Sequence, residues 1–108
     1  MLLLTILGTL AGCGPNCQST CNRIYGDAPN CGIQRGGRTQ VELYDRCITE
    51  CETAMDSPGE LDGYDPLVRQ GSSEDINIEN EKQAAVWMDC IAESDCSRLS
   101  SGYCAPIW

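Results

Sequence analysis

The sequence predicts a small all-α domain that is held together by disulfide bonds and contains little or no β-sheet. The chain has 108 residues, nine cysteines and no Phe, so disulfides can compensate for a thin core. Two Cys-x3-Cys motifs each place a pair of cysteines on one face of a helix. Other apolar residues also recur at helical spacing, and no segment alternates with a period of two. We therefore expect a disulfide-stapled bundle, with a helical hairpin carrying a twin CX3C ladder and two shorter helices.

The hairpin is predicted from two segments, residues 15–25 and 40–55. Pro15 suits the first position of the first helix, and a capping box of Thr39 and Glu42 starts the second. The face shared in the first helix comprises Cys17, Cys21, Ile24 and Tyr25. The apolar stripe of the second helix comprises Val41, Tyr44, Ile48, Cys51 and Met55, and it is broadened by Leu43, Cys47 and Ala54.

The C-terminal half is predicted as an acidic loop, two shorter helices and a tail. Residues 56–75 are rich in Pro, Gly and acidic side chains, and they form either a mobile linker or a functional loop. A helix is expected over 78–93 with Asn77 as its cap, and a short one over 95–102. The buried face of the longer helix comprises Ala84, Trp87, Cys90 and Ile91.

The N-terminal segment predicts export. Residues 1–12 are uncharged and six of them are Leu or Ile, but a helix of this length spans only about 18 Å, too short for a bilayer. The segment fits the apolar part of a signal peptide. The following Leu10-Ala11-Gly12-Cys13 resembles the lipobox of bacterial lipoproteins. The resemblance implies cleavage before Cys13 and acylation of its thiol, which leaves 13–108 as one extracytoplasmic domain. Alternatively, residues 1–12 stay in place as a short membrane anchor.

The other eight cysteines are expected to form four disulfides. If the two CX3C helices pack antiparallel, the outer and inner cysteines meet, which predicts Cys17–Cys51 and Cys21–Cys47. The last four cysteines allow three pairings. One of them, Cys31–Cys90 with Cys96–Cys104, would tie the hairpin to the third helix and close the C-terminus.

Two resemblances accompany this cysteine pattern. The twin CX3C hairpin is similar to that of small mitochondrial intermembrane-space proteins. A broader likeness includes Trp87-Met88-Asp89-Cys90 and the late Cys96 and Cys104. In this respect the chain resembles the cysteine-rich small lipoproteins of Myxococcota, a family without assigned function. That resemblance implies a helical disulfide domain and no particular chemistry.

The composition excludes several classes of function. A net charge of −9 disfavours nucleic acid as a partner, because phosphate binding needs clustered Lys and Arg. The chain has no His and no CxxC, so it offers no catalytic triad, zinc knuckle or redox motif. We therefore expect no enzyme activity and no cofactor.

A membrane-tethered accessory subunit of a larger complex in the bacterial envelope is the expected function. Its protein partner would dock on the acidic loop, at Glu60, Asp62 and Asp65, or on Trp108. Alternatively, Trp108 folds back on the core. The alternatives are a binding module for a small ligand or for calcium at the loop carboxylates, and a thiol-redox protein of the mitochondrial twin CX3C kind.

Overall fold

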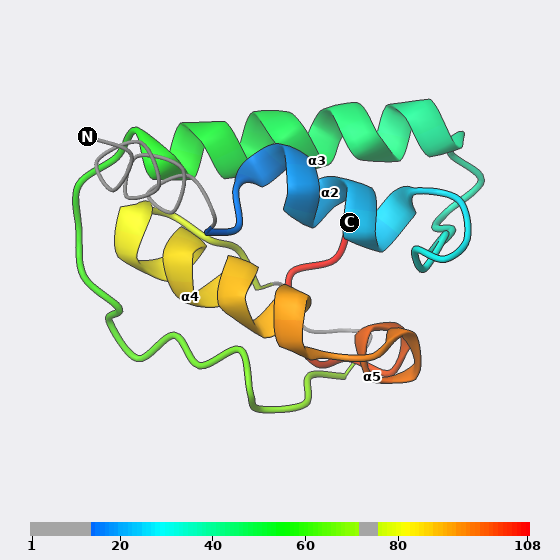
Figure 1. Cartoon of the computed structure of the whole chain (residues 1–108). Coiled ribbons are helices and arrows are strands. Elements are labelled where there is room, and N and C mark those ends of the chain that lie inside the picture. Colours follow the sequence, from blue (N-terminus) through cyan, green and yellow to red (C-terminus); the bar gives the residue numbers. More distant parts are fainter. Residues whose placement is uncertain (1–13, 72–75) are drawn as a thin grey trace, which may run out of the picture.

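The computed structural model describes residues 14–71 and 76–108, and within these two ranges it contains helices and no strand. The prediction of an all-α domain is therefore confirmed. Three helices, α2, α3 and α4, each contact the other two, and the short α5 follows the end of α4 (Figure 1). Their bounds are α2 Cys17–Tyr25, α3 Gln40–Met55, α4 Glu81–Glu93 and α5 Cys96–Ser100.

Three of the four helices begin one to three residues later than predicted, each directly after a capping Asn or Asp. Asn16 caps α2 by accepting a 2.8 Å hydrogen bond from the Ser19 amide, so Pro15 lies before the helix. Asn80, not Asn77, caps α4 by accepting from two amides of its first turn. Asp95 caps α5. Asn and Asp at these positions satisfy amides that have no partner within the helix.

Helix α3 begins at the predicted capping box. The Thr39 hydroxyl accepts from the Glu42 amide at 3.1 Å, and the Glu42 carboxylate accepts from the Thr39 amide at 2.8 Å. The hydrogen bond from the Thr39 amide also lowers the pKa of Glu42. Two local side chains thus define the start of the longest described helix.

The buried face of α3 differs from the predicted apolar stripe. Val41 is 67% exposed and Met55 is 42% exposed. Of the predicted stripe, only Cys51 is fully buried, whereas all three residues expected to broaden it, Leu43, Cys47 and Ala54, are buried. The disulfides orient the helix so that both cysteines face α2, which turns Val41 toward solvent. Met55 shares the face of Cys51 but is the last residue of α3.

Two disulfides join α2 to α3 as a ladder. Cys17 pairs with Cys51 and Cys21 with Cys47, at Cα–Cα distances of 5.7 and 5.8 Å, which is the pairing predicted from the CX3C spacing. These distances fall in the usual range for disulfides. Three of the four cysteines are fully buried, so the ladder is also part of the core.

The pairing named above for the last four cysteines is wrong. Cys31 joins Cys96 and Cys90 joins Cys104, instead of Cys31–Cys90 and Cys96–Cys104. The reason is the path of the tail, which folds back under α4. The Trp87 indole N–H donates to the carbonyls of Cys104 and Pro106 at 3.0 and 2.9 Å. Cys90 lies one turn after Trp87, so the same bonds bring Cys104 to it.

The core lies where the three longer helices meet the tail. Trp87 is its largest fully buried side chain, with Tyr25, Ile24 and Leu43 also fully buried. The predicted buried face of α4 is confirmed: Ala84, Trp87, Cys90 and Ile91 are all buried. None of the helices in the described ranges combines the length and apolar character that crossing a membrane requires.

Candidate functional site

The first part of the loop after α3 is hydrogen-bonded to the start of α4. The Asn80 side-chain amide donates to the Glu60 carbonyl at 2.9 Å, and the Gln83 side-chain amide donates to the Leu61 carbonyl at 3.0 Å. Both donors are buried residues at the start of α4. The cap of the helix therefore also holds the start of the loop.

The end of the described part of the loop is bonded to the tail. The Cys104 amide donates to the Pro66 carbonyl, and the Gln70 amide donates to the Gly102 carbonyl, both at 2.9 Å. Gly102 has φ +108°, and a Cβ there would clash with the Gln70 carbonyl oxygen, so this close approach requires glycine. These bonds hold the described part of the loop against α4 and the tail.

Between this loop and α4 lies a groove of about 570 Å³, which we call the acidic groove. Its apolar surface comes from Leu61, Tyr64, Pro66, Leu67 and Val86, together with Cys90. Leu67 is 68% exposed and Leu61 is 43% exposed, although both are large apolar side chains. A groove that offers leucines to solvent is suited to binding a partner rather than to filling the core.

Three carboxylates line the acidic groove, and its described lining contains no Lys or Arg. Asp65 comes from the loop, whereas Asp89 and Glu93 lie one turn apart on α4. Asp65 also accepts a 3.0 Å hydrogen bond from the Leu67 amide, which sets the course of the loop there. The sequence analysis missed Asp89 and Glu93, although their spacing of four on a helix is a signal for a shared face.

One residue of the groove lining, Tyr64, has a hydroxyl whose pKa is shifted by its surroundings. Tyr64 donates its hydroxyl to the Ala105 carbonyl, and it is half-buried. Burial, and next the negative charge of Asp65, raise the pKa of the Tyr64 hydroxyl. Tyr64 therefore stays neutral and acts as a hydrogen-bond donor that ties the loop to the tail.

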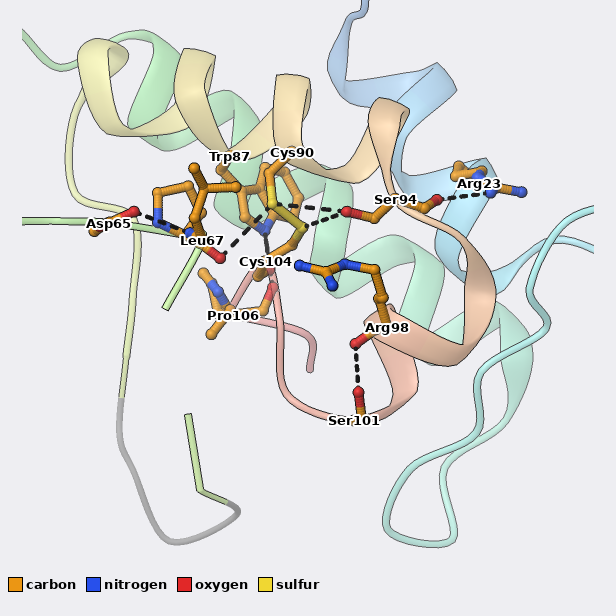
Figure 2. The surroundings of a disulfide bond; sticks show 12 residues. Arg23, Asp65, Leu67, Trp87, Cys90, Ser94, Arg98, Ser101, Cys104 and Pro106 are labelled. Atoms are coloured by element: carbon orange, nitrogen blue, oxygen red, sulfur yellow. Dashed lines mark hydrogen bonds between the residues drawn. A yellow bond between two sulfur atoms is a disulfide. The ribbon is translucent and has the colours of Figure 1, made fainter. Parts of the chain in front are cut away.

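Figure 2 shows the disulfide between Cys90 and Cys104, which lies beside the groove. Ser94 Oγ lies 3.3 Å from Cys104 Sγ and must be the donor, because a disulfide sulfur carries no proton. The Ser94 carbonyl accepts from the Arg23 guanidinium at 2.9 Å, which links α4 to α2. The eight cysteines of the described residues form four disulfides, so this part of the chain holds no thiol to act as a nucleophile.

The other predicted docking residues do not line this groove. Glu60 and Asp62 are exposed on the loop outside its lining. Trp108 folds back: its ring packs edge-on against Trp87 at 5.7 Å, and its carbonyl accepts from the Tyr25 hydroxyl at 2.7 Å. The structure thus brings only Asp65 of the predicted set into the groove.

A second hollow, which the sequence did not indicate, is lined in part by the tail. Three arginines line it, Arg35, Arg46 and Arg69, together with Trp108. They come from three separate segments, so no local pattern in the sequence connects them.

Two predicted sites remain to be placed, the lipid acceptor and the calcium site of the loop carboxylates. Cys13, the predicted lipid acceptor, and residues 1–12 lie outside the described residues. In the described ranges, no three His, Cys, Asp or Glu side chains gather closely enough to hold a metal ion. Glu60, Asp62 and Asp65 are therefore not assembled as the calcium alternative would require.

A comparison of the chain with protein-family models, curated proteins and solved structures found no match.

Proposed function

We propose that this chain is a non-catalytic, membrane-tethered lipoprotein of the bacterial envelope that serves as an accessory subunit of a larger complex. Its acidic groove docks a basic, amphipathic segment of a protein partner. The observation that carries the proposal is the groove itself, where exposed leucines lie among three carboxylates and no cation lines the described surface.

Charge and shape favour a basic segment as the occupant. A partner's leucine-like side chains would cover Leu61 and Leu67, while its Lys or Arg side chains would approach Asp65, Asp89 and Glu93. The net charge of −9 would speed the encounter with such a segment and oppose an acidic one. Because disulfides and backbone bonds fix both walls of the groove, little ordering is needed on binding.

The tether rests on Leu10-Ala11-Gly12-Cys13 and on the oxidising compartment that four disulfides favour. Lipidation of Cys13 would hold the domain at a membrane, so that docking occurs near the surface. An acyl pair on one residue is sufficient for stable anchoring.

The tether predicts the behaviour of a Cys13→Ser variant. The wild-type chain is expected to incorporate an alkyne-labelled fatty acid in a bacterial host and to sediment with membranes, with an intact mass that begins at acylated Cys13. Cys13→Ser removes the acceptor thiol, so the label is expected to be lost and the mature mass absent. Gly14→Ser is the matched control and should keep both the fatty-acid label and the mass of the mature acylated chain. A wild-type chain without label that still sediments with membranes would instead support a retained anchor at residues 1–12.

Docking in the acidic groove predicts selective binding of a basic amphipathic peptide. The probes are two helical peptides of equal length, one of Lys and Leu and the other of Glu and Leu, titrated into the full chain in detergent. We expect only the Lys peptide to shift the methyl resonances of Leu61, Leu67 and Val86. We expect Asp89→Asn with Glu93→Gln to weaken binding by about tenfold, and the effect to shrink as salt is added.

Matched controls separate docking from general attraction to an acidic protein. Asp45→Asn with Glu52→Gln removes the same charge from exposed positions of α3 outside the groove. Leu67→Ser removes an exposed side chain in the groove, and Val41→Ser removes an equally exposed one on α3. If the α3 variants weakened binding as much as the groove variants, docking at the groove would be wrong.

A further inference from the structure

The arginine-lined hollow is a distinct site, which we call the arginine pocket. It has a volume of about 450 Å³, which falls in the range of small-molecule pockets. Its walls come from the loop after α2, from α3, from the described residues between α3 and α4, from α5 and from the tail. It shares none of its lining residues with the acidic groove.

The charge of the arginine pocket is opposite to that of the molecule. The chain has seven Lys and Arg against sixteen Asp and Glu, and three of the seven line this pocket: Arg35, Arg46 and Arg69. No Asp or Glu belongs to its described lining. Neutral donors accompany the arginines, namely Gln70, Asn77, Ser100 and Ser101. Three like charges repel one another, and a bound anion would relieve this repulsion.

Two of the guanidinium groups have donors to spare. Arg69 Nε donates to the Ser101 carbonyl at 2.7 Å, which orients the guanidinium and leaves its terminal N–H groups unused by this bond. Arg35 Nε is buried and has no hydrogen-bond partner. A buried donor without a partner costs free energy, and the guanidinium has further N–H groups with which it can bind an oxyanion.

Arg35 and Arg46 both line the pocket, although they come from different segments. Both act on the Tyr25 hydroxyl: burial raises the pKa of Tyr25 to about 12, while the charges of Arg35 and Arg46 partly oppose this effect. Tyr25 in turn donates to the Trp108 carbonyl. The positive charges are therefore concentrated beside the end of the tail.

The pocket also has an apolar wall. Its apolar lining comprises Leu99, Tyr103, Pro106, Ile107 and Trp108. Trp108 is held in place by its edge-on contact with Trp87 and by the bond from Tyr25. An anion with an apolar part can thus contact the guanidinium groups and this apolar wall at the same time.

We infer that the arginine pocket binds a small organic oxyanion, a phosphate monoester or carboxylate that also carries an apolar group. Guanidinium forks match the geometry of these oxyanions, and Lys, which lacks the fork, is absent from the described lining. The same chemistry occurs in a free metabolite and in a lipid headgroup. The inference goes beyond the proposed docking function, because it concerns a different site with the opposite charge.

The test uses the full chain in non-ionic detergent and follows the side-chain N–H resonances of its arginines by NMR. The probes are phenyl phosphate, benzoate, inorganic phosphate and uncharged phenol. We expect phenyl phosphate and benzoate to shift Arg35, Arg46 and Arg69, inorganic phosphate to shift them more weakly, and phenol to have no effect. Vesicles of phosphatidylcholine with phosphatidic acid, compared with phosphatidylcholine alone, distinguish a lipid headgroup from a free anion as the source.

Substitutions assign the binding to the pocket. Arg69→Ala and Arg46→Ala are each expected to raise the Kd for phenyl phosphate by about tenfold, as loss of a charge-assisted hydrogen bond predicts. The Kd of Arg69→Lys should lie between those of the wild type and Arg69→Ala, because lysine keeps the charge but lacks the guanidinium fork. Arg38→Ala is the control, since Arg38 is exposed and outside the lining. The inference is wrong if no anion shifts the arginines, in which case they only support the tail, or if Arg38→Ala weakens binding equally.

Discussion

Replacement of Trp87 by Ala is expected to lower the free energy of unfolding by about 4 kcal/mol, the largest effect of any single substitution here. Trp87 is fully buried and is the largest side chain in the core. Its indole N–H also donates to two carbonyls of the tail, at Cys104 and Pro106. The substitution would therefore leave a cavity and two buried carbonyls without their donor. Urea unfolding, followed by circular dichroism of the oxidised chain, measures the change.

A second substitution separates these two causes. Trp87→Phe keeps most of the ring but removes the N–H, so it should cost about 1–3 kcal/mol. The exposed Asp89→Ala on the same helix is the control and should change stability by less than about 0.5 kcal/mol. If Trp87→Phe matched the wild type, the bonds to the tail would contribute nothing net to stability.

Removal of the Cys31–Cys96 bridge by Cys31→Ala with Cys96→Ala is expected to cost about 4 kcal/mol, on a chain-entropy model of loop closure. This bridge has the largest sequence separation of the four, 65 residues, so it restricts the unfolded chain most. Both cysteines are only half-buried, so the loss of packing is small and the measured change reports mainly on the cross-link. Urea unfolding of the two oxidised proteins compares them directly.

The same variant makes a local prediction. Amide hydrogens of α5 should exchange faster when the bridge is absent, whereas those of α2 and α3 should keep their relative protection through their own ladder. Full reduction of both proteins should abolish the difference between them, because neither then has the cross-link. A loss below about 1 kcal/mol would show that other contacts, not the bridge, hold α5 in place.

Local patterns predicted the parts of the fold that depend on local physics. The CX3C spacing indicated the ladder because residues four apart share a helix face, and the Thr39–Glu42 capping box marked the start of α3. The position of the α4 cap was missed because Asn77 and Asn80 are both good caps. Only the bonds of Asn80 to the loop distinguish the two.

The remaining errors arise from contacts between distant segments. The pairing of Cys90 with Cys104 depends on the tail folding under Trp87, and no spacing in the sequence encodes that path. The acidic groove needs Asp65 and α4 side by side. The arginine pocket needs three segments to meet, so its residues looked like isolated surface charges.

The disulfide connectivity has a consequence for the order in which the chain is oxidised. In order of position, the eight cysteines pair first with fifth, second with fourth, third with seventh and sixth with eighth, so no bridge joins neighbours. In a chain that crosses a membrane N-terminus first, Cys17 and Cys21 emerge together long before Cys51. Oxidation in order of emergence would trap non-native pairs, and Cys31 would have to wait for Cys96. If the domain is exported as proposed, its folding would require a thiol–disulfide isomerase as well as an oxidant.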